Sequence, residues 1–83
     1  MKTLLQPGDK IKIREDINNT ELYYMASNEK REKWLGTDKM AKPGQLVTIK
    51  EIINGTYRIN EEPVFNYTDD MFDPGVINLL KEE

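Results

Sequence analysis

The sequence contains neither cysteine nor histidine. Without cysteine there is no disulfide framework, no thiolate zinc site and no cysteine nucleophile. Without histidine the chain lacks the commonest general base, the commonest transition-metal ligand and the usual titratable switch near neutral pH. Ser-His-Asp and Cys-His catalytic sets are therefore impossible, and we expect a protein that is not an enzyme and that uses no cofactor.

Long hydrophobic runs are also missing. The opening MKTLLQPGDK has one lysine and two adjacent leucines before a Pro-Gly turn, so it lacks the apolar core of a secretory signal. No apolar run approaches the roughly 20 residues of a membrane span. Together with the absence of cysteine, these features lead us to expect a cytoplasmic protein that does not contact a membrane.

The chain has 83 residues, which predicts one small domain over residues 1–83. A domain of this size buries about 60% of its unfolded surface, so its margin of stability is thin. Apolar residues make up 37% of the chain and charged residues 33%, which still permits a core because the apolar residues are clustered.

Charge is divided unevenly along the chain. Residues 1–50 hold ten Lys and Arg against seven Asp and Glu, whereas residues 51–83 hold two against eight. Such asymmetry marks an interaction surface in some proteins. We favour the simpler interpretation that strands from both halves interleave in the fold and mix their charges.

Residues 7–15 begin with a Pro-Gly turn and continue as a strand. Ile11 and Ile13 alternate with Lys10, Lys12 and Arg14. This period of two predicts a half-buried strand with one basic face in solvent.

The strongest local pattern lies in residues 45–60, QLVTIKEIINGTYRIN. Asn54-Gly55 separates two β-branched and aromatic runs, and this dipeptide is typical of a type I′ turn because both central positions need a positive φ. We predict a β-hairpin here.

The segment between these strands is irregular, and we treat residues 20–44 as an insertion. Tyr23, Tyr24 and Met25 favour a short extended piece. Ser27 is a candidate cap for a short helix over residues 28–35, with Gly36 ending it. Trp34 and Leu35 are its only large apolar residues, and such a short helix needs a surface to pack on.

The C-terminal third predicts two further short strands, residues 61–67 and 75–80, joined by an acidic turn. The sum is an all-β domain of about five short strands, which suggests a small barrel or sandwich.

The acidic turn holds Asp69, Asp70 and Asp73 around Met71 and Phe72. Three carboxylates are able to bind a hard cation, and two in different environments are able to exchange protons. The spacing is not that of a calcium loop, and we expect Asp69 and Asp70 both to be exposed. We therefore predict no metal site here: Thr68 and Asp69 cap the turn while Met71 and Phe72 fill the core.

Three pieces in order, PGDKIKIRED, MAKPGQLVTIKEI with GTYRINEE, and YTDDMFDP, resemble the small uncharacterised SH3-like barrel proteins of phages and prophages of Gram-positive bacteria. That family tends to open with Gly-Asp-Lys/Arg and a basic strand. It tends to end with an aromatic residue and a Thr/Ser-Asp-Glu/Asp-Met-Phe/Leu element. The resemblance covers about half of the chain. It implies an SH3-like barrel and a phage or prophage protein acting in the cytoplasm of a bacterial host, and it implies no known activity.

We expect a binding module that acts by protein–protein interaction, with inhibition of a host factor as one version, in which the acidic second half occupies a nucleic-acid groove. Residues 27–38 depart from the family frame, and loops on rigid scaffolds often carry binding. Packing in the core is the simpler role for the aromatic residues, and solvation is the simpler role for the charged ones. The candidate partner-binding residues are Tyr23, Tyr24, Lys30, Arg31, Lys33 and Trp34.

The alternative is a nucleic-acid-binding accessory protein that uses the basic strand. Alternate basic side chains on a strand make an electrostatic stripe for phosphates. The candidate residues are Lys10, Lys12 and Arg14, although acids flank them and the net charge of the chain is −3.

Overall fold

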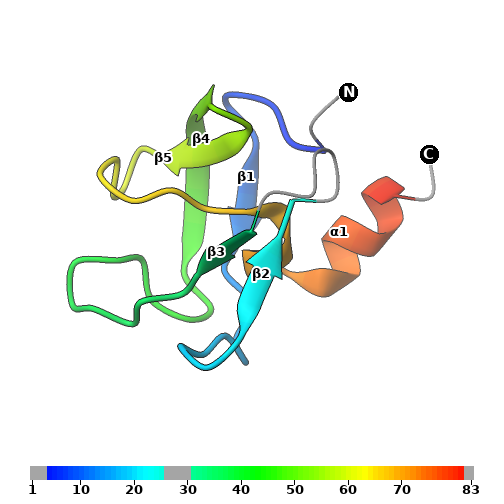
Figure 1. The fold of residues 1–83 in the computed structure, drawn as a ribbon. Helices are drawn as coiled ribbons and strands as arrows, with labels where there is room; N and C mark the ends of the chain where they lie inside the picture. The colour runs from blue at the N-terminus through cyan, green and yellow to red at the C-terminus, as the bar shows by residue number, and fades with distance from the viewer. Residues whose placement is uncertain (1–3, 26–30, 82–83) are drawn as a thin grey trace.

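The computed structural model describes residues 4–25 and 31–81, which form two antiparallel sheets, one short 3₁₀ helix and one α-helix (Figure 1). One sheet has the strand order β1-β4-β5, and the other pairs β2 with β3. The elements are β1 (Lys10–Lys12), β2 (Leu22–Tyr24), β3 (Arg31–Lys33), β4 (Leu46–Ile53), β5 (Thr56–Ile59), η1 (Asp69–Met71) and α1 (Pro74–Lys81).

The β4–β5 hairpin is the prediction that the structure confirms most fully. Asn54 and Gly55 both have positive φ, 52° and 79°, as a type I′ turn requires. The strands pair from Ile53↔Thr56 at the turn to Ile49↔Ile59, with one irregularity between Ile49 and Glu51. The predicted first strand is confirmed as well, because Ile11 and Ile13 are buried while Lys10 and Lys12 are exposed.

The segment 67–72 connects the two edges of the three-stranded sheet. Tyr67 makes an isolated antiparallel bridge with Tyr57 of β5, and Phe72 makes another with Ile13 beside β1. Between the bridges η1 turns the chain. The strand ladders of the described residues do not close into a continuous barrel, so the structure establishes a small, strand-rich fold of two sheets and one α-helix.

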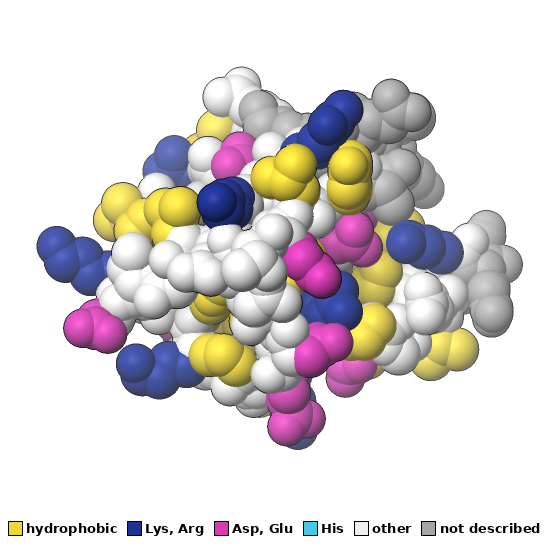
Figure 2. Space-filling view, turned by 60° about the horizontal axis from the view of Figure 1, so that its bottom comes forward, with side chains coloured by type: hydrophobic (Ala, Val, Ile, Leu, Met, Phe, Trp, Pro, Cys, Tyr) yellow, Lys and Arg dark blue, Asp and Glu magenta, His cyan; other side chains and the backbone are white. Residues whose placement is uncertain are grey.

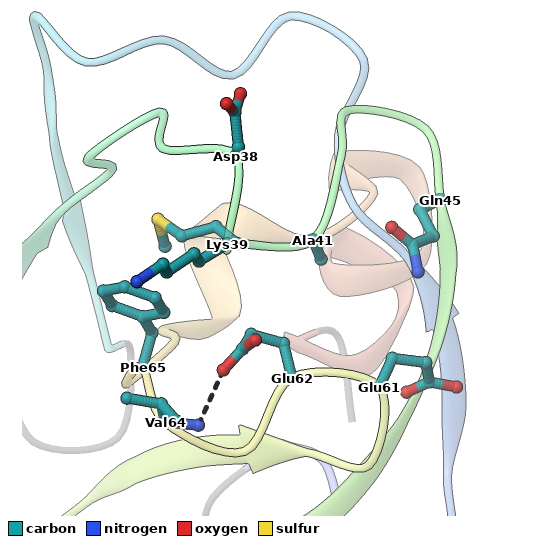
Figure 3. A pocket seen from close by; sticks show the side chains of 9 residues that line it. Asp38, Lys39, Ala41, Gln45, Glu61, Glu62, Val64 and Phe65 are labelled. Atoms are coloured by element: carbon teal, nitrogen blue, oxygen red, sulfur yellow. Dashed lines mark hydrogen bonds between the residues drawn. The ribbon is translucent and has the colours of Figure 1, made fainter.

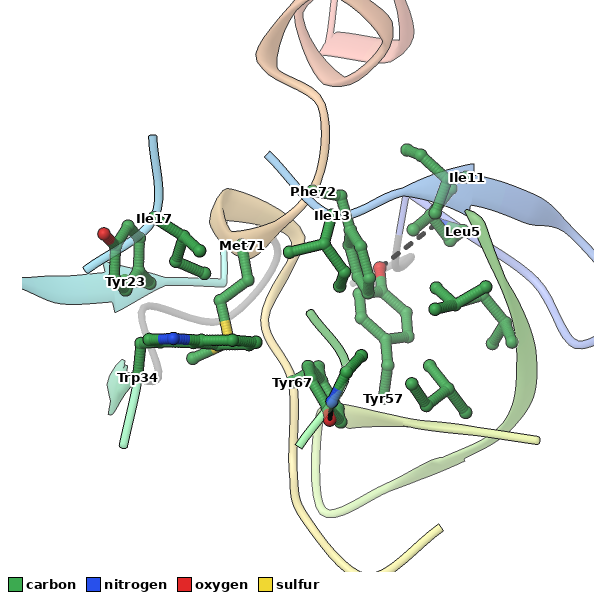
Figure 4. Close-up of a cluster of buried hydrophobic side chains, with 14 of the residues drawn as sticks. Leu5, Ile11, Ile13, Ile17, Tyr23, Trp34, Tyr57, Tyr67, Met71 and Phe72 are labelled. Atoms are coloured by element: carbon green, nitrogen blue, oxygen red, sulfur yellow. Dashed lines mark hydrogen bonds between the residues drawn. The ribbon is translucent and has the colours of Figure 1, made fainter. Parts of the chain in front are cut away.

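Met71 and Phe72 fill the centre of this arrangement, as predicted. Both are fully buried, and the ring of Phe72 lies 5.9 Å from that of Tyr57 and 6.3 Å from that of Tyr67 (Figure 4). The ring of Trp34 reaches the same cluster, 6.0 Å from Tyr67, so this aromatic residue is part of the core. The apolar core therefore joins both sheets.

Three predicted elements are wrong. Residues 31–33, expected within a helix over residues 28–35, form a strand; they alternate outward and inward, which suits pairing with β2, and residues 26–30 lie outside the described part of the chain. Residues 75–80, expected to be a strand, belong to α1. Residues 61–67 form no named strand and contribute the single bridge at Tyr67.

The start of α1 explains why this segment is helical. The Asp73 side chain accepts a hydrogen bond from the Gly75 amide at 2.9 Å, as an N-cap residue does, and the backbone oxygen of Asp73 accepts from Ile77 at 3.0 Å. Pro74 follows the cap at the first helical position, where its missing N–H costs nothing. Within residues 4–25 and 31–81 no helix has the length and apolar character needed to cross a membrane.

Candidate functional site

The β2–β3 hairpin has an outward face that combines apolar and basic side chains. The strands pair as Leu22↔Lys33, Tyr23↔Glu32 and Tyr24↔Arg31. Because side chains alternate along a strand, the first and third pairs point outward and the middle pair points inward. Leu35 continues the alternation. We call the outward set the hairpin face: Leu22, Tyr24, Arg31, Lys33 and Leu35.

Large apolar side chains are unusually open on the hairpin face. Leu22 is 50% exposed, Tyr24 44% and Leu35 51%. The guanidinium of Arg31 lies over the ring of Tyr24, 5.4 Å from its centroid, in cation–π geometry. The outward residues of β2 and β3 include two cations and no acid, so the face is apolar and positively charged.

The structure brings together three of the predicted partner-binding residues and separates the others from them. Tyr24, Arg31 and Lys33 lie on the hairpin face. Tyr23 and Trp34 point inward and are only 2% and 3% exposed, which makes them part of the core instead of the surface. Lys30 lies outside the described residues. Leu22 and Leu35 were not among the predicted residues, although the alternation around Tyr23 and Trp34 indicates them.

Polar contacts fix the hairpin to the rest of the molecule. The Asp70 carboxylate accepts a hydrogen bond from the Tyr24 amide at 3.1 Å, and the amide of Asp69 donates to the sulfur of Met25 at 3.3 Å. The Tyr23 hydroxyl accepts from the Asn18 amide at 2.9 Å. These hydrogen bonds therefore hold β2, and with it the hairpin face, against the rest of the molecule.

The acidic turn has mainly an architectural role. Asp70 accepts a hydrogen bond from the amide of Tyr24, and Asp73 accepts one from the amide of Gly75, so both acids make structural contacts. Two details of the prediction are wrong: Asp69 is fully buried, and the Thr68 side chain makes no capping hydrogen bond. Within the described ranges, no three acidic side chains come close enough together to hold a metal ion.

The basic strand is only partly available. Lys10 and Lys12 are exposed on the outer side of β1. Arg14 instead makes a two-pronged contact with Asp16, at 2.8 and 3.1 Å, donates to the backbone oxygen of Asp70 at 3.1 Å and lies 5.6 Å from the centroid of the Tyr23 ring. These contacts orient Arg14 along its own surface and leave two lysines as the accessible cations of the stripe.

The Arg14–Asp16 contact also changes the acidity of both groups. The hydrogen bond with Asp16 raises the pKa of Arg14 above its ordinary value, and the same hydrogen bond lowers the pKa of Asp16. The cation is thus compensated locally at neutral pH. Figure 2 shows basic and acidic side chains interspersed over one side of the molecule, as the interleaving of the two halves predicts.

A second surface feature was not foreseen. A cleft of about 590 Å³ lies between the segment 38–41 and the segment 61–65 (Figure 3). Its apolar and charged side chains come from parts of the chain that are far apart in the sequence. No local sequence pattern therefore predicts the cleft. The lining residues are Asp38, Lys39, Met40, Ala41, Gln45, Glu61, Glu62, Val64 and Phe65.

No family model matches the chain, and neither a curated protein nor a solved structure matches it.

Proposed function

We propose that this chain is a non-enzymatic protein-binding module that contacts its partner through the hairpin face. The observation that carries the proposal is the half exposure of Leu22, Tyr24 and Leu35 beside two cations. Aromatic residues and arginine are enriched in protein interfaces and supply much of their binding energy. A rigid tyrosine stacked by an arginine is a suitable anchor, because little side-chain freedom is lost on binding.

The positive charge of the hairpin face favours a partner whose contact surface is acidic. Arg31 and Lys33 are both exposed and carry positive charge, so an acidic patch on the partner is complementary. In the phage or prophage setting that the resemblance implies, such binding would serve to inhibit a host factor. The contact would then be made through the basic hairpin face and not through the acidic second half of the chain.

We further propose that the two sheets are an SH3-like barrel whose closure is reduced to single bridges. The bridges Tyr57↔Tyr67 and Ile13↔Phe72 support this, because they return the chain from the β5 edge to the β1 edge. The turn η1 between them, with Met71 buried beneath it, supports it too. The SH3-like proteins of phages and prophages that the sequence resembles remain the proposed family.

The experiment is affinity capture from an extract of the bacterium that carries the gene, followed by identification of what is retained. Two double variants are compared with the unaltered chain. Arg31→Glu with Lys33→Glu reverses the hairpin face, and Lys10→Glu with Lys12→Glu reverses the basic strand. Both pairs lie on short strands at exposed positions, and both change the net charge by the same amount.

The proposal expects one protein that is retained by the unaltered chain and by the basic-strand variant, and lost with the hairpin variant. Melting curves of both variants check that the fold survives. Retention of the same protein by the hairpin variant would contradict the proposal. Retention of DNA or RNA instead, in a salt-dependent manner that the basic-strand variant removes, would favour the nucleic-acid alternative.

A further inference from the structure

The cleft between segments 38–41 and 61–65 has the size of a ligand site. Its volume of about 590 Å³ falls in the usual range, and its lining is polar and apolar in equal measure. Val64, 70% exposed, and the half-buried Phe65 supply apolar surface along one wall. Met40 and Ala41 of the opposite wall are buried and belong to the core, so this side of the cleft is firm.

Glu62 is the polar group that the cleft positions best. Its Oε1 accepts a hydrogen bond from the Val64 amide at 2.9 Å, which holds the carboxylate between the walls (Figure 3). Glu61, next to it, is held in the same way by the Thr48 amide at 2.9 Å. Each contact uses Oε1, and the negative charge is fixed in place before any ligand arrives.

The cleft also contains a cation of the chain itself. Lys39 lies on the wall opposite Val64 and points its ammonium end toward Phe65 (Figure 3). An aromatic ring and a carboxylate together favour a cation that also has an apolar stem. Lys39 is exposed and a lysine stem is long and freely rotating, so its ammonium group is able to move aside when another cation enters.

We propose that the cleft binds a protein segment in which an arginine is flanked by apolar residues. The guanidinium meets Glu62 and stacks by Phe65, while an apolar neighbour covers Val64. Arginine fits better than lysine because its planar group both stacks and donates to a carboxylate in two prongs. The cleft shares no residue with the hairpin face, so the two sites are tested separately.

The test is a titration of the isotope-labelled chain, followed by the amide signals of its nuclear magnetic resonance spectrum. The probe is a pool of short capped peptides with a central arginine and randomised apolar neighbours. A matched pool replaces the arginine with citrulline, which has the same shape and no charge. We expect saturable shifts confined to residues 38–41 and 61–65 with the arginine pool, and severalfold weaker binding of the citrulline pool.

If the mechanism is correct, three variants have three different effects on the affinity for the arginine pool. Glu62→Gln keeps a carbonyl oxygen for the Val64 amide and removes only the charge, so affinity should fall about threefold, the size of one partly exposed ion pair. Lys39→Gln removes a positive charge that lines the cleft and repels an incoming guanidinium, so affinity should rise by a similar factor. Glu21 is an exposed carboxylate outside the cleft, so the control variant Glu21→Gln should leave the affinity unchanged.

The rise with Lys39→Gln is the decisive result, because a variant that merely damages the fold does not bind more tightly. Equal binding of the two pools, shifts that map elsewhere, or no shifts at the highest peptide concentration would each overturn the proposal. Loss of affinity with Lys39→Gln would overturn it as well.

Discussion

Single polar atoms connect the segment 68–73 to the rest of the molecule. The Asp70 carboxylate accepts a hydrogen bond from the amide of Tyr24, and the Asp73 carboxylate accepts one from the amide of Gly75. Thr68 differs from both, since it is fully buried and its hydroxyl oxygen has no hydrogen-bond partner among the described residues. The segment thus contains two polar groups that stabilise the fold and one, the Thr68 hydroxyl, that destabilises it.

Thr68→Val is therefore expected to leave the free energy of unfolding unchanged or to raise it by about 1 kcal/mol, because a buried unpaired hydroxyl is replaced by a methyl group of similar size. Thr56→Val is the matched control. The Thr56 hydroxyl donates to the backbone oxygen of Ile53 at 2.8 Å, and its loss should cost about 1 kcal/mol. Urea unfolding measures both, and equal destabilisation would contradict the account of Thr68.

Tyr67 makes the free energy of unfolding depend on pH in the alkaline range. Burial raises the pKa of Tyr67, the hydrogen bond from the Ala41 amide opposes this, and the charge of Glu62 adds to the increase. The pKa is higher in the folded state than in the unfolded chain, so the contribution is complete below about pH 10 and is lost as pH rises through the folded-state pKa.

We expect the free energy of unfolding to begin to fall near that unfolded-state value of about pH 10. Tyr67→Phe should be less stable at neutral pH, because it loses the acceptor for the Ala41 amide, yet should lack the part of the alkaline decline due to this group. Denaturant unfolding over a pH series tests this. Parallel declines in the two proteins would mean that Tyr67 titrates normally.

At the scale of elements, α1 depends on Asp73, the residue that precedes it. Asp73→Ala should remove the cap and cost about 1 kcal/mol, whereas Asp73→Asn should retain most of the stability because asparagine also caps well. Urea unfolding combined with far-ultraviolet circular dichroism measures the loss of stability and of helix. An alanine variant as stable as the asparagine variant would show that the hydrogen bond to Gly75 does not hold this helix.

The elements differ in how far the sequence predicts them. The β4–β5 hairpin is set by local chemistry, since Asn54 and Gly55 tolerate positive φ and the flanking runs favour strands. Helix α1 was missed because Val76, Ile77, Leu79 and Leu80 also suit a strand. The Asp73-Pro74 pair was the local signal that would have decided it.

The strand β3 is determined by its tertiary partner. Arg31–Lys33 is short and charged, and nothing within it selects a strand over a helix. It forms because pairing with β2 turns Trp34 toward Tyr67 in the core. For the same reason the sequence indicated some residues of the hairpin face but not their arrangement, and it gave no sign of the cleft.

At the scale of the whole molecule, the two proposed sites have opposite character. The hairpin face carries Arg31 and Lys33, whereas the cleft is lined by three acids and one cation, Asp38, Glu61, Glu62 and Lys39. Each charge sits beside exposed apolar side chains. The two cations of the hairpin face come from the basic first half of the chain, and Glu61 and Glu62 come from the acidic second half, which suits a module that binds protein segments of different sign.

The most direct measurement is the dissociation constant of the captured partner for the unaltered chain and for the two charge-reversed double variants, by calorimetry. Losing a central arginine contact costs at least about 2 kcal/mol, or about thirtyfold, in a typical interface. We expect at least this loss for Arg31→Glu with Lys33→Glu, and less than about threefold for Lys10→Glu with Lys12→Glu. The reverse order of the two variants would contradict binding through the hairpin face.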